Sequence, residues 1–219
     1  MSEVPKGAIL QRDKETYAIV PRIPMGILTP EILEKLARIA RKYHVRIIKI
    51  TSGQRIALVG FKAEQIEEVW KELDIEVGPA EGLCVHYVQS CPGTETCKFG
   101  QGDSLGLAAK IEKMFVGREE TVPAKTKFGI SGCMLNCAES YLRDFGAFAT
   151  PKGWTAVVGG NSGGRPRIGN VIAENLSDEA VLSLLQRCLE YYSKHAKPRE
   201  RMPRFIERVG VDEFKKAVL

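Results

Sequence analysis

The sequence contains no run of apolar residues that approaches the roughly 20 needed for a membrane-spanning helix. Its first residues, MSEVPKGAILQRDKE, also lack the apolar core of a secretory signal peptide. We therefore expect a cytoplasmic protein that does not enter a membrane. Disulfides are rare in that compartment, where clustered cysteines more often bind metal or take part in redox chemistry.

Aromatic residues make up only 7% of the chain, and no aromatic-rich stacking motif of the kind found in RNA or single-strand binders is present. The formal net charge of +5 suggests an acidic partner, but without a recognition motif it does not indicate nucleic acid. We expect no nucleic-acid partner. No solenoid repeat or low-complexity segment is present either. A chain of 219 residues can bury a core as one domain or as two small ones.

The first part of the chain, residues 1–77, alternates between strand and helix patterns. Thr29 and Pro30 are typical of a helix start, and apolar residues then recur at helical spacing up to Tyr43. The pattern predicts strands at Thr16–Pro24, Val45–Thr51, Arg55–Gly60 and Ile75–Val77, and a second helix at Ala63–Leu73. This order is that of a small ferredoxin-like α+β unit. The segment Gly78–Gly82, GPAEG, is the expected boundary.

Residues 78–219 are expected to form a second α+β domain. Its pattern predicts a helix at Ser104–Val116, strands at Lys125–Ser131, Gly146–Thr150 and Trp154–Val158, and a glycine-rich loop at Gly159–Arg167. Ser177 is the expected N-cap of a long amphipathic helix that runs to Lys194, and a short helical tail follows.

Four of the six cysteines form two close pairs. Five residues separate Cys91 from Cys97, and three separate Cys133 from Cys137. Zinc sites usually repeat one tight spacing of two to four residues, whereas a cubane iron–sulfur cluster holds each iron by a separate thiolate and tolerates wider loops. The spacing therefore favours an iron–sulfur cluster, with zinc and four purely structural cysteines as the alternatives.

The backbone around the pairs supports the same interpretation. Pro92, Gly93 and Gly132 let the chain curl, so that N–H groups can donate hydrogen bonds to sulfur. Cys188 lies among apolar residues of the long helix, and Cys84 precedes an apolar strand-like stretch, so we expect both to be structural.

The segments CPGTETCKFG and SGCMLNCAES together resemble the cysteine signature of the siroheme-dependent sulfite and nitrite reductases. The hairpin ITSGQRIALVG, the strand VPAKTKFGISGC and the loop GWTAVVGGNSGGRPR are similar to further segments of that family. The match covers nearly the whole chain, at the length of one family repeat. The resemblance implies that Cys91, Cys97, Cys133 and Cys137 hold a [4Fe–4S] cluster. It also implies that the Cys137 thiolate is the axial ligand of siroheme.

The resemblance also implies a set of basic site residues. Lys125 and Lys127 match the family's K-x-K strand, although without it both would be interpreted as surface lysines. Arg55 and His86 are further catalytic candidates, but many relatives carry the hairpin arginine at the position of Gly53 and an arginine at that of His86. Candidates to bind siroheme besides Cys137 are Arg55, Lys127, Asn161, Arg165 and Arg167.

The resemblance implies a six-electron reduction of sulfite to sulfide at siroheme coupled to the cluster. Nitrite reduction by the same cofactors is the close alternative. A non-catalytic iron–sulfur electron carrier and a zinc-stabilised binding module are the alternatives from other classes. No flavin or nicotinamide site is visible, so we expect a small ferredoxin-type electron donor. A single repeat lacks the second half that flanks the cofactor in larger relatives, so a homodimer and an unusually open site are the two alternatives.

Overall fold

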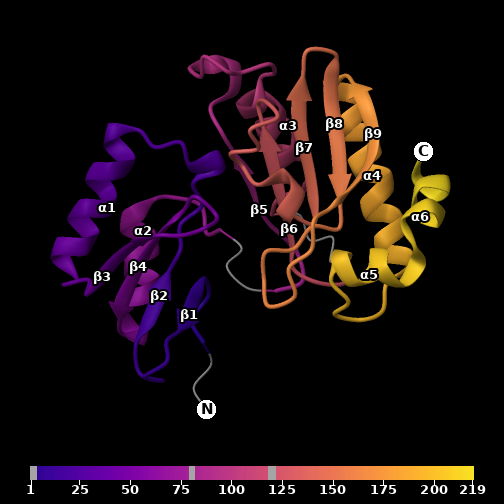
Figure 1. Cartoon of the computed structure of the whole chain (residues 1–219). Helices are drawn as coiled ribbons and strands as arrows, with labels where there is room; N and C mark the ends of the chain where they lie inside the picture. Colours follow the sequence, from indigo (N-terminus) through magenta and orange to yellow (C-terminus); the bar gives the residue numbers. More distant parts are fainter. Residues whose placement is uncertain (1–3, 79–81, 118–121) are drawn as a thin grey trace. The chain divides into compact units, whose positions relative to one another are not determined.

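The structure is a computed structural model that describes residues 4–78, 82–117 and 122–219 (Figure 1). The chain divides into two compact units, Met1–Glu81 and Gly82–Leu219. Part of the expected boundary, residues 79–81, lies outside the described residues. Among the described helices, none combines the length and the apolar character needed to cross a membrane.

The first unit is an antiparallel sheet with two helices, in the strand order β1-β2-β4-β3. The strands are β1 (Ala8–Leu10), β2 (Tyr17–Ile19), β3 (Ile47–Ile50) and β4 (Ile56–Phe61), and the helices are α1 (Pro30–Lys42) and α2 (Ile66–Leu73). Short 3-10 turns, η1 (Pro24–Gly26) and η2 (Ala63–Gln65), precede the helices.

The helix start at Thr29 is confirmed, because its hydroxyl accepts a hydrogen bond from the Ile32 N–H at 3.3 Å. The two helices bury one apolar face each against the sheet. Together they enclose a core of fully or nearly fully buried side chains, which includes Ile19, Leu36, Ile39, Leu58, Phe61, Val69 and Leu73.

Two expectations for this unit are wrong. Residues Ile75–Val77 do not form a strand; instead β1 pairs with β2, and the Glu76 carbonyl accepts one backbone hydrogen bond from Arg22. The strand expected over Thr16–Pro24 is also shorter, since it ends at Ile19. Pro21 and Pro24 have no N–H to donate to a neighbouring strand, so the ladder ends before them.

The second unit is a five-stranded mixed sheet in the sequential order β5-β6-β7-β8-β9. Strands β5 (Val85–Ser90), β6 (Thr126–Ser131) and β7 (Phe145–Thr150) are parallel, whereas β8 (Gly153–Val158) and β9 (Asn170–Leu176) are added antiparallel. The helices are α3 (Ser104–Phe115), α4 (Asp178–His195), α5 (Met202–Val209) and α6 (Val211–Val218). Two further 3-10 turns are η3 (Gly93–Glu95) and η4 (Ser140–Leu142).

One face of this sheet packs into an apolar core. Phe128 of β6 lies edge-on between Phe115 of α3 and Phe145 of β7, with ring centroids 6.4 Å and 5.9 Å away. Side chains alternate along a strand, so Lys127 and Gly129 belong to the opposite face of β6. Figure 1 shows α3 and α4 on the same side of the sheet, which leaves the face that carries Lys127 free of long helices.

The caps of the long helices confirm their expected starts. Ser177 accepts a hydrogen bond from the Ala180 N–H at 3.2 Å and so caps α4. Asp103 accepts one from Gly106 and caps α3. Strand β9 had no counterpart in the expected elements, because its sequence, NVIAENL, alternates too weakly to stand out.

Candidate cofactor-binding site

Both cysteine loops leave the sheet at the carboxyl ends of two neighbouring parallel strands. Cys91 follows β5 directly, and Cys133 comes two residues after the end of β6. Ser90 pairs with Ile130 across these strands, and the Cys91 N–H donates to the Ile130 carbonyl at 3.4 Å. Because parallel strands end at the same edge of a sheet, the fold brings the two loops together.

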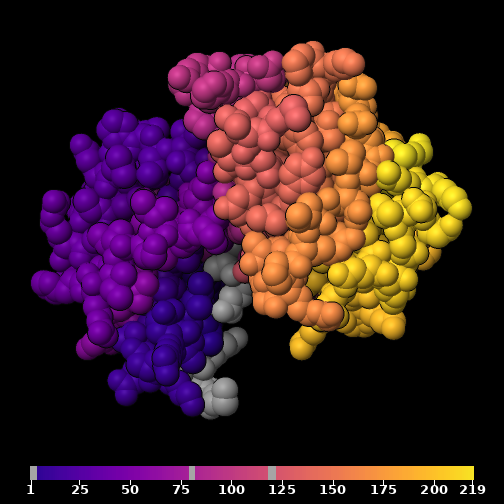
Figure 2. Space-filling model, in the orientation of Figure 1, coloured from indigo at the N-terminus to yellow at the C-terminus, as the bar shows by residue number. Residues whose placement is uncertain are grey.

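Backbone hydrogen bonds then join the loops to each other. The Gly132 carbonyl accepts from the N–H groups of Gln101 and Gly102, at 2.7 Å and 3.1 Å. The Gly132 N–H in turn donates to Cys91 Sγ at 3.1 Å, which is the N–H···S contact expected from the sequence. In the space-filling view the first cysteine loop (magenta) lies at the surface at one end of the second unit (Figure 2).

Glycine is required where the loops touch. A Cβ atom on Gly132 would lie 2.4 Å from the Gly93 Cα, and one on Gly100 would lie 2.6 Å from the Gly93 carbonyl carbon. Real side chains do not approach backbone atoms so closely, so Gly132 lets the two loops adjoin and Gly100 lets the first loop fold back on itself.

The second loop is held in shape by a small polar network. Asn136 adopts a left-handed backbone conformation (φ 59°) between Cys133 and Cys137, and its Oδ1 accepts from the Ser140 N–H at 2.8 Å. The buried Ser131 hydroxyl accepts from the Ala138 N–H at 3.1 Å. This network was not predicted, although asparagine between two cysteines is the residue that best tolerates such a turn.

The six cysteines, all of them among the described residues, form no disulfide with one another. Cys188 is buried in α4, where burial raises the pKa of its thiol, and this fits the structural role expected for it. Of the four paired cysteines, Cys91 and Cys133 are half-buried, whereas Cys97 and Cys137 are exposed.

The donor chemistry fits an iron–sulfur cluster. Four free thiols stand on two adjoining loops, and one of them already accepts a backbone N–H. A [4Fe–4S] cluster needs four thiolates at four separate irons, so they need not converge on one point. Within the described residues, no group of three or more His, Cys, Asp or Glu side chains is arranged around a single metal ion.

Lys127 lies on the face of β6 opposite α3 and is about half-buried. Its Nζ atom is 6.0 Å from the centroid of the Tyr87 ring. Burial lowers the pKa of the Lys127 ammonium, and the nearby positive charges of Arg201 and Arg143 lower it further. Lys125 precedes the first residue of β6 and is also half-buried.

Asp144, the residue directly before β7, links this lysine to the C-terminal part of the unit. Its buried carboxylate accepts from the Lys127 backbone N–H at 2.8 Å and from the Arg201 guanidinium at 2.9 and 2.7 Å. Burial raises the pKa of the Asp144 carboxyl, and the ion pair with Arg201 opposes that shift. Sequence reasoning missed both residues, because 57 positions separate them.

Arg143 is a second buried cation that sequence reasoning missed. Only 4% of its surface is exposed, and its guanidinium donates to Gln89, Glu139 and Ser162. Its Nε atom is buried and has no hydrogen-bond partner within the described part of the chain. The dipeptide Arg143-Asp144 at the entry to an apolar strand was the available signal.

The glycine-rich loop between β8 and β9 closes on itself. The backbones of Asn161 and Arg167 pair at 2.9 Å, and the Asn161 side-chain amide donates to the Arg165 carbonyl. The Arg167 guanidinium donates to the Gly159 carbonyl and to Asn170 Oδ1. Of the three residues expected to contact siroheme here, Arg165 is exposed, whereas Asn161 and Arg167 are half-buried.

The two remaining candidates are buried. His86 in β5 is 1% exposed, and its Nε2 atom lies 3.1 Å from the Gly82 carbonyl oxygen. Arg55 belongs to the first unit, is 8% exposed, and precedes β4. The structure therefore brings Lys127, Arg143 and Arg201 together in the second unit. The roles expected for His86 and Arg55 stay predictions.

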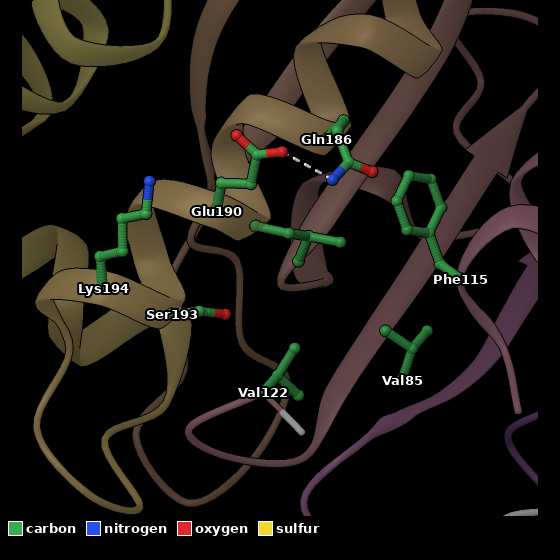
Figure 3. A pocket seen from close by; sticks show the side chains of 8 residues that line it. Val85, Phe115, Val122, Gln186, Glu190, Ser193 and Lys194 are labelled. Carbon is green, nitrogen blue, oxygen red and sulfur yellow. Dashed lines mark hydrogen bonds between the residues drawn. The ribbon is translucent and has the colours of Figure 1, made fainter. Parts of the chain in front are cut away.

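A mostly apolar pocket of about 420 Å³ lies at the other end of β5, where Val85 begins the strand (Figure 3). Phe115, Val122 and Leu189 line it, and Gln186 and Glu190, joined by a 2.8 Å hydrogen bond, form part of its rim. None of the candidate site residues lines it, and Cys91 follows the opposite end of the strand. We do not assign the site to this pocket.

Both units of the chain match known protein families. Residues 81–219 match the family model of the nitrite and sulphite reductase 4Fe-4S domain, and residues 9–74 match that of the nitrite/sulfite reductase ferredoxin-like half domain. The assimilatory-type sulfite reductase of Nitratidesulfovibrio vulgaris is 57% identical over 219 residues, which is the whole of both chains. A nitrite reductase [NAD(P)H] of Bacillus subtilis is 38% identical over 204 residues, 93% of this chain and 25% of that protein.

Two solved structures share the fold. The Mycobacterium tuberculosis NirA protein superposes with a TM-score of 0.79 at 18% identity, over 93% of this chain and 39% of that one. A dissimilatory sulfite reductase I superposes with a TM-score of 0.80 at 16% identity, over 93% of this chain and 69% of that one. The expected fold class is confirmed: a ferredoxin-like half-domain followed by an α+β domain of the 4Fe-4S type.

The contact between Gly132 and Gly93 can be tested by substitution. Gly132→Ala should force the cysteine loops apart, lower the free energy of unfolding by about 1–3 kcal/mol and reduce the iron bound per chain. The control is Met134→Ala, which truncates an exposed side chain between the same two cysteines. Thermal unfolding and iron analysis of both variants check this; normal iron in Gly132→Ala would contradict it.

The surroundings of Lys127 predict its titration. Burial and two neighbouring arginines disfavour the ammonium, so Lys127 should lose its proton at lower pH than an ordinary lysine. Lys71 provides the contrast, because its hydrogen bond to Glu67 raises its pKa. Competitive acetylation across a pH series, read out by mass spectrometry, measures both. If Lys127 becomes reactive only at the same pH as Lys71, or at a higher pH, its pKa is not lowered and the prediction is wrong.

Proposed function

The chain belongs to the nitrite and sulphite reductase family, and from that premise we propose that it reduces sulfite to sulfide in a six-electron reaction. The observation that carries the proposal is the pair of adjoining loops with four free thiols, in a chain that matches an assimilatory-type sulfite reductase along its whole length. Members of this family are oxidoreductases, so the class of reaction follows from membership.

Siroheme and a [4Fe–4S] cluster are the cofactors of the family. When bound, they supply electrons one at a time to an anion held at the siroheme iron. We assign Cys91, Cys97, Cys133 and Cys137 to the cluster, and Cys137 also to the siroheme iron. Two features support the double role of Cys137: its thiol is exposed, and the left-handed turn at Asn136 separates it from the half-buried Cys133.

The face of β6 that carries Lys127 supplies the positive charge that an anionic substrate and a carboxylate-rich tetrapyrrole need. Lys127 combines a lowered pKa with the nearby positive charges of Arg201 and Arg143, which suits a residue that gives up a proton more readily than an ordinary lysine. Lys125, Arg55 and His86 are kept as further proposed catalytic residues. Arg55 and Lys127 are also kept as siroheme contacts, together with Asn161, Arg165 and Arg167.

Nitrite reduction by the same residues is the second candidate, because a nitrite reductase [NAD(P)H] is 38% identical over most of this chain. This chain spans only a quarter of that protein but all of the sulfite reductase relative. The full-length match favours sulfite. Steady-state assays with sulfite and with nitrite separate the two activities. If neither anion is reduced, the chain is a non-catalytic iron–sulfur electron carrier instead.

We further propose a cytoplasmic enzyme with a small ferredoxin-type electron donor. Three apolar side chains on the cysteine loops, Phe99, Met134 and Leu135, are 52%, 71% and 65% exposed, and Lys98 lies beside Phe99. Such a surface next to the thiols suits a protein donor, because it brings the two redox centres close. The homodimer suggested by the single repeat stays a prediction, which gel filtration with light scattering can test.

The double role of Cys137 separates it from Cys133 in experiment. Cys137→Ser should remove a siroheme ligand as well as a cluster ligand, because a serine hydroxyl is a poor substitute for a thiolate. Cys133→Ser should damage the cluster while the axial field of the siroheme iron is unchanged. Mössbauer or EPR spectra with siroheme absorption measure this in both variants. Magnetically uncoupled cofactors in the unmodified protein, or an unchanged axial field in Cys137→Ser, would refute the assignment.

A further inference from the structure

The residues that follow Cys137, positions 138–144, lead from the second cysteine loop into β7, and we call them the linking segment. The backbone of this segment is hydrogen-bonded to glycines at or next to the two ends of the glycine-rich loop. The Gly169 N–H donates to the Tyr141 carbonyl at 2.8 Å, that of Gly160 to Arg143 at 2.9 Å and that of Gly159 to Asp144 at 2.9 Å. The second cysteine loop and the glycine-rich loop are therefore joined through one short segment.

The Arg143 side chain strengthens this junction. Its Nη2 atom donates to Glu139 Oε2 and to Gln89 Oε1, both at 2.6 Å, and its Nη1 atom donates to the Ser162 hydroxyl at 3.2 Å. Glu139 belongs to the linking segment, Gln89 to β5 and Ser162 to the glycine-rich loop. One guanidinium therefore connects three of the segments that surround the proposed cofactor site, and its planar fork suits such a connection.

Two glycines make room for the linking segment. A Cβ atom on Gly129 of β6 would lie 2.8 Å from Arg143 Cγ and 2.5 Å from the Ala138 carbonyl oxygen. A Cβ atom on Gly160 would lie 2.2 Å from the Tyr141 carbonyl oxygen. Because neither position carries a side chain, the segment lies directly against the strand and against the glycine-rich loop.

Arg143 is occupied by protein groups and is not available to an anion in solution. Only 4% of its surface is exposed, and the Glu139 carboxylate at 2.6 Å balances its charge. Its Nε atom is buried and has no hydrogen-bond partner among the described residues. An unpaired buried donor costs folding free energy, so stability alone does not account for an arginine at this position.

We propose that Arg143 is a positioning residue that fixes the Cys137 thiol relative to the glycine-rich loop. It holds the turn that follows this thiol, the glycine-rich loop and β5 in one arrangement. The inference rests on the proposed function, because that function assigns Cys137 and the glycine-rich loop to siroheme. Loss of the Arg143 guanidinium should therefore change the geometry at Cys137, and not only the stability of the second unit.

The test uses two variants of the complete protein and one control. Arg143→Met removes the guanidinium and its hydrogen bonds to all three segments. Ser162→Ala removes only the contact with the glycine-rich loop, at an exposed position where the fold tolerates the change. Arg208→Met is the matched control. Arg208 of α5 donates two hydrogen bonds to Glu200 and one to the His195 carbonyl, and neither partner belongs to a cysteine loop or to the glycine-rich loop.

Two measurements on the protein with its cofactors separate positioning from simple stabilisation. Arg143→Met should shift the EPR g values of the siroheme iron, which report its axial ligand. It should also speed amide hydrogen exchange about tenfold in both the second cysteine loop and the glycine-rich loop, relative to the amides of α4 in the same protein. Arg208→Met should lower the melting temperature but leave the g values unchanged. Unchanged g values in Arg143→Met, or exchange in either loop within about threefold of the control, would overturn the proposal.

Ser162→Ala decides the question if Arg143→Met does not fold. Ser162 lies outside the second cysteine loop, so an effect of its loss there has to pass through Arg143. Exchange in the second cysteine loop should rise more than about twofold over that in Arg208→Met. A rise confined to the glycine-rich loop, or no rise in either loop, would overturn the proposal.

Failure of the proposed function gives a different result. An unmodified protein that contains no siroheme would refute the function by itself. Hydrogen exchange does not need siroheme, so it then tests the role of Arg143 alone. Arg143→Met should still speed exchange in both loops, whereas exchange as slow as in Arg208→Met would overturn the positioning role.

Discussion

The parallel pairing of β5 with β6 is the constraint on which the rest of the site depends. It aligns the carboxyl ends of the two strands, so that Cys91 and Cys133 begin their loops at one edge of the sheet. The glycine contacts and the Gly132 N–H···S hydrogen bond then complete the approach of the loops. Without that pairing, four cysteines spread over 47 positions would not be brought close enough to bind one cluster.

Strand β6 also joins the two chemical environments of the site. Lys127 lies near its start, among Arg143, Arg201 and Asp144, and the strand leads at its other end to Cys133. Thiolates favour iron, whereas guanidinium and ammonium groups favour carboxylates and oxyanions. One strand of six residues, roughly 20 Å long, therefore spans the region between the proposed metal-binding edge and the proposed anion-binding face.

Local signals in the sequence predicted much of this. The unequal cysteine spacing, the caps at Thr29 and Ser177 and the helix and strand periods are short-range features, and the corresponding elements are present. The prediction of a strand at Ile75–Val77 was wrong. The local pattern does not show that β2 pairs with β1 rather than with that segment. The Asp144–Arg201 pair was missed because it joins residues far apart in sequence, and only tertiary packing brings them together.

The central claim is that the four thiols hold one iron–sulfur cluster that is coupled to siroheme. Metal and sulfide analysis of the unmodified protein, purified without oxygen, tests it most directly. The account predicts iron and acid-labile sulfide in a ratio of about five to four, with four irons from the cluster and one from siroheme, and strong visible tetrapyrrole bands. Stoichiometric zinc in place of iron, or cluster iron without those bands, would contradict it.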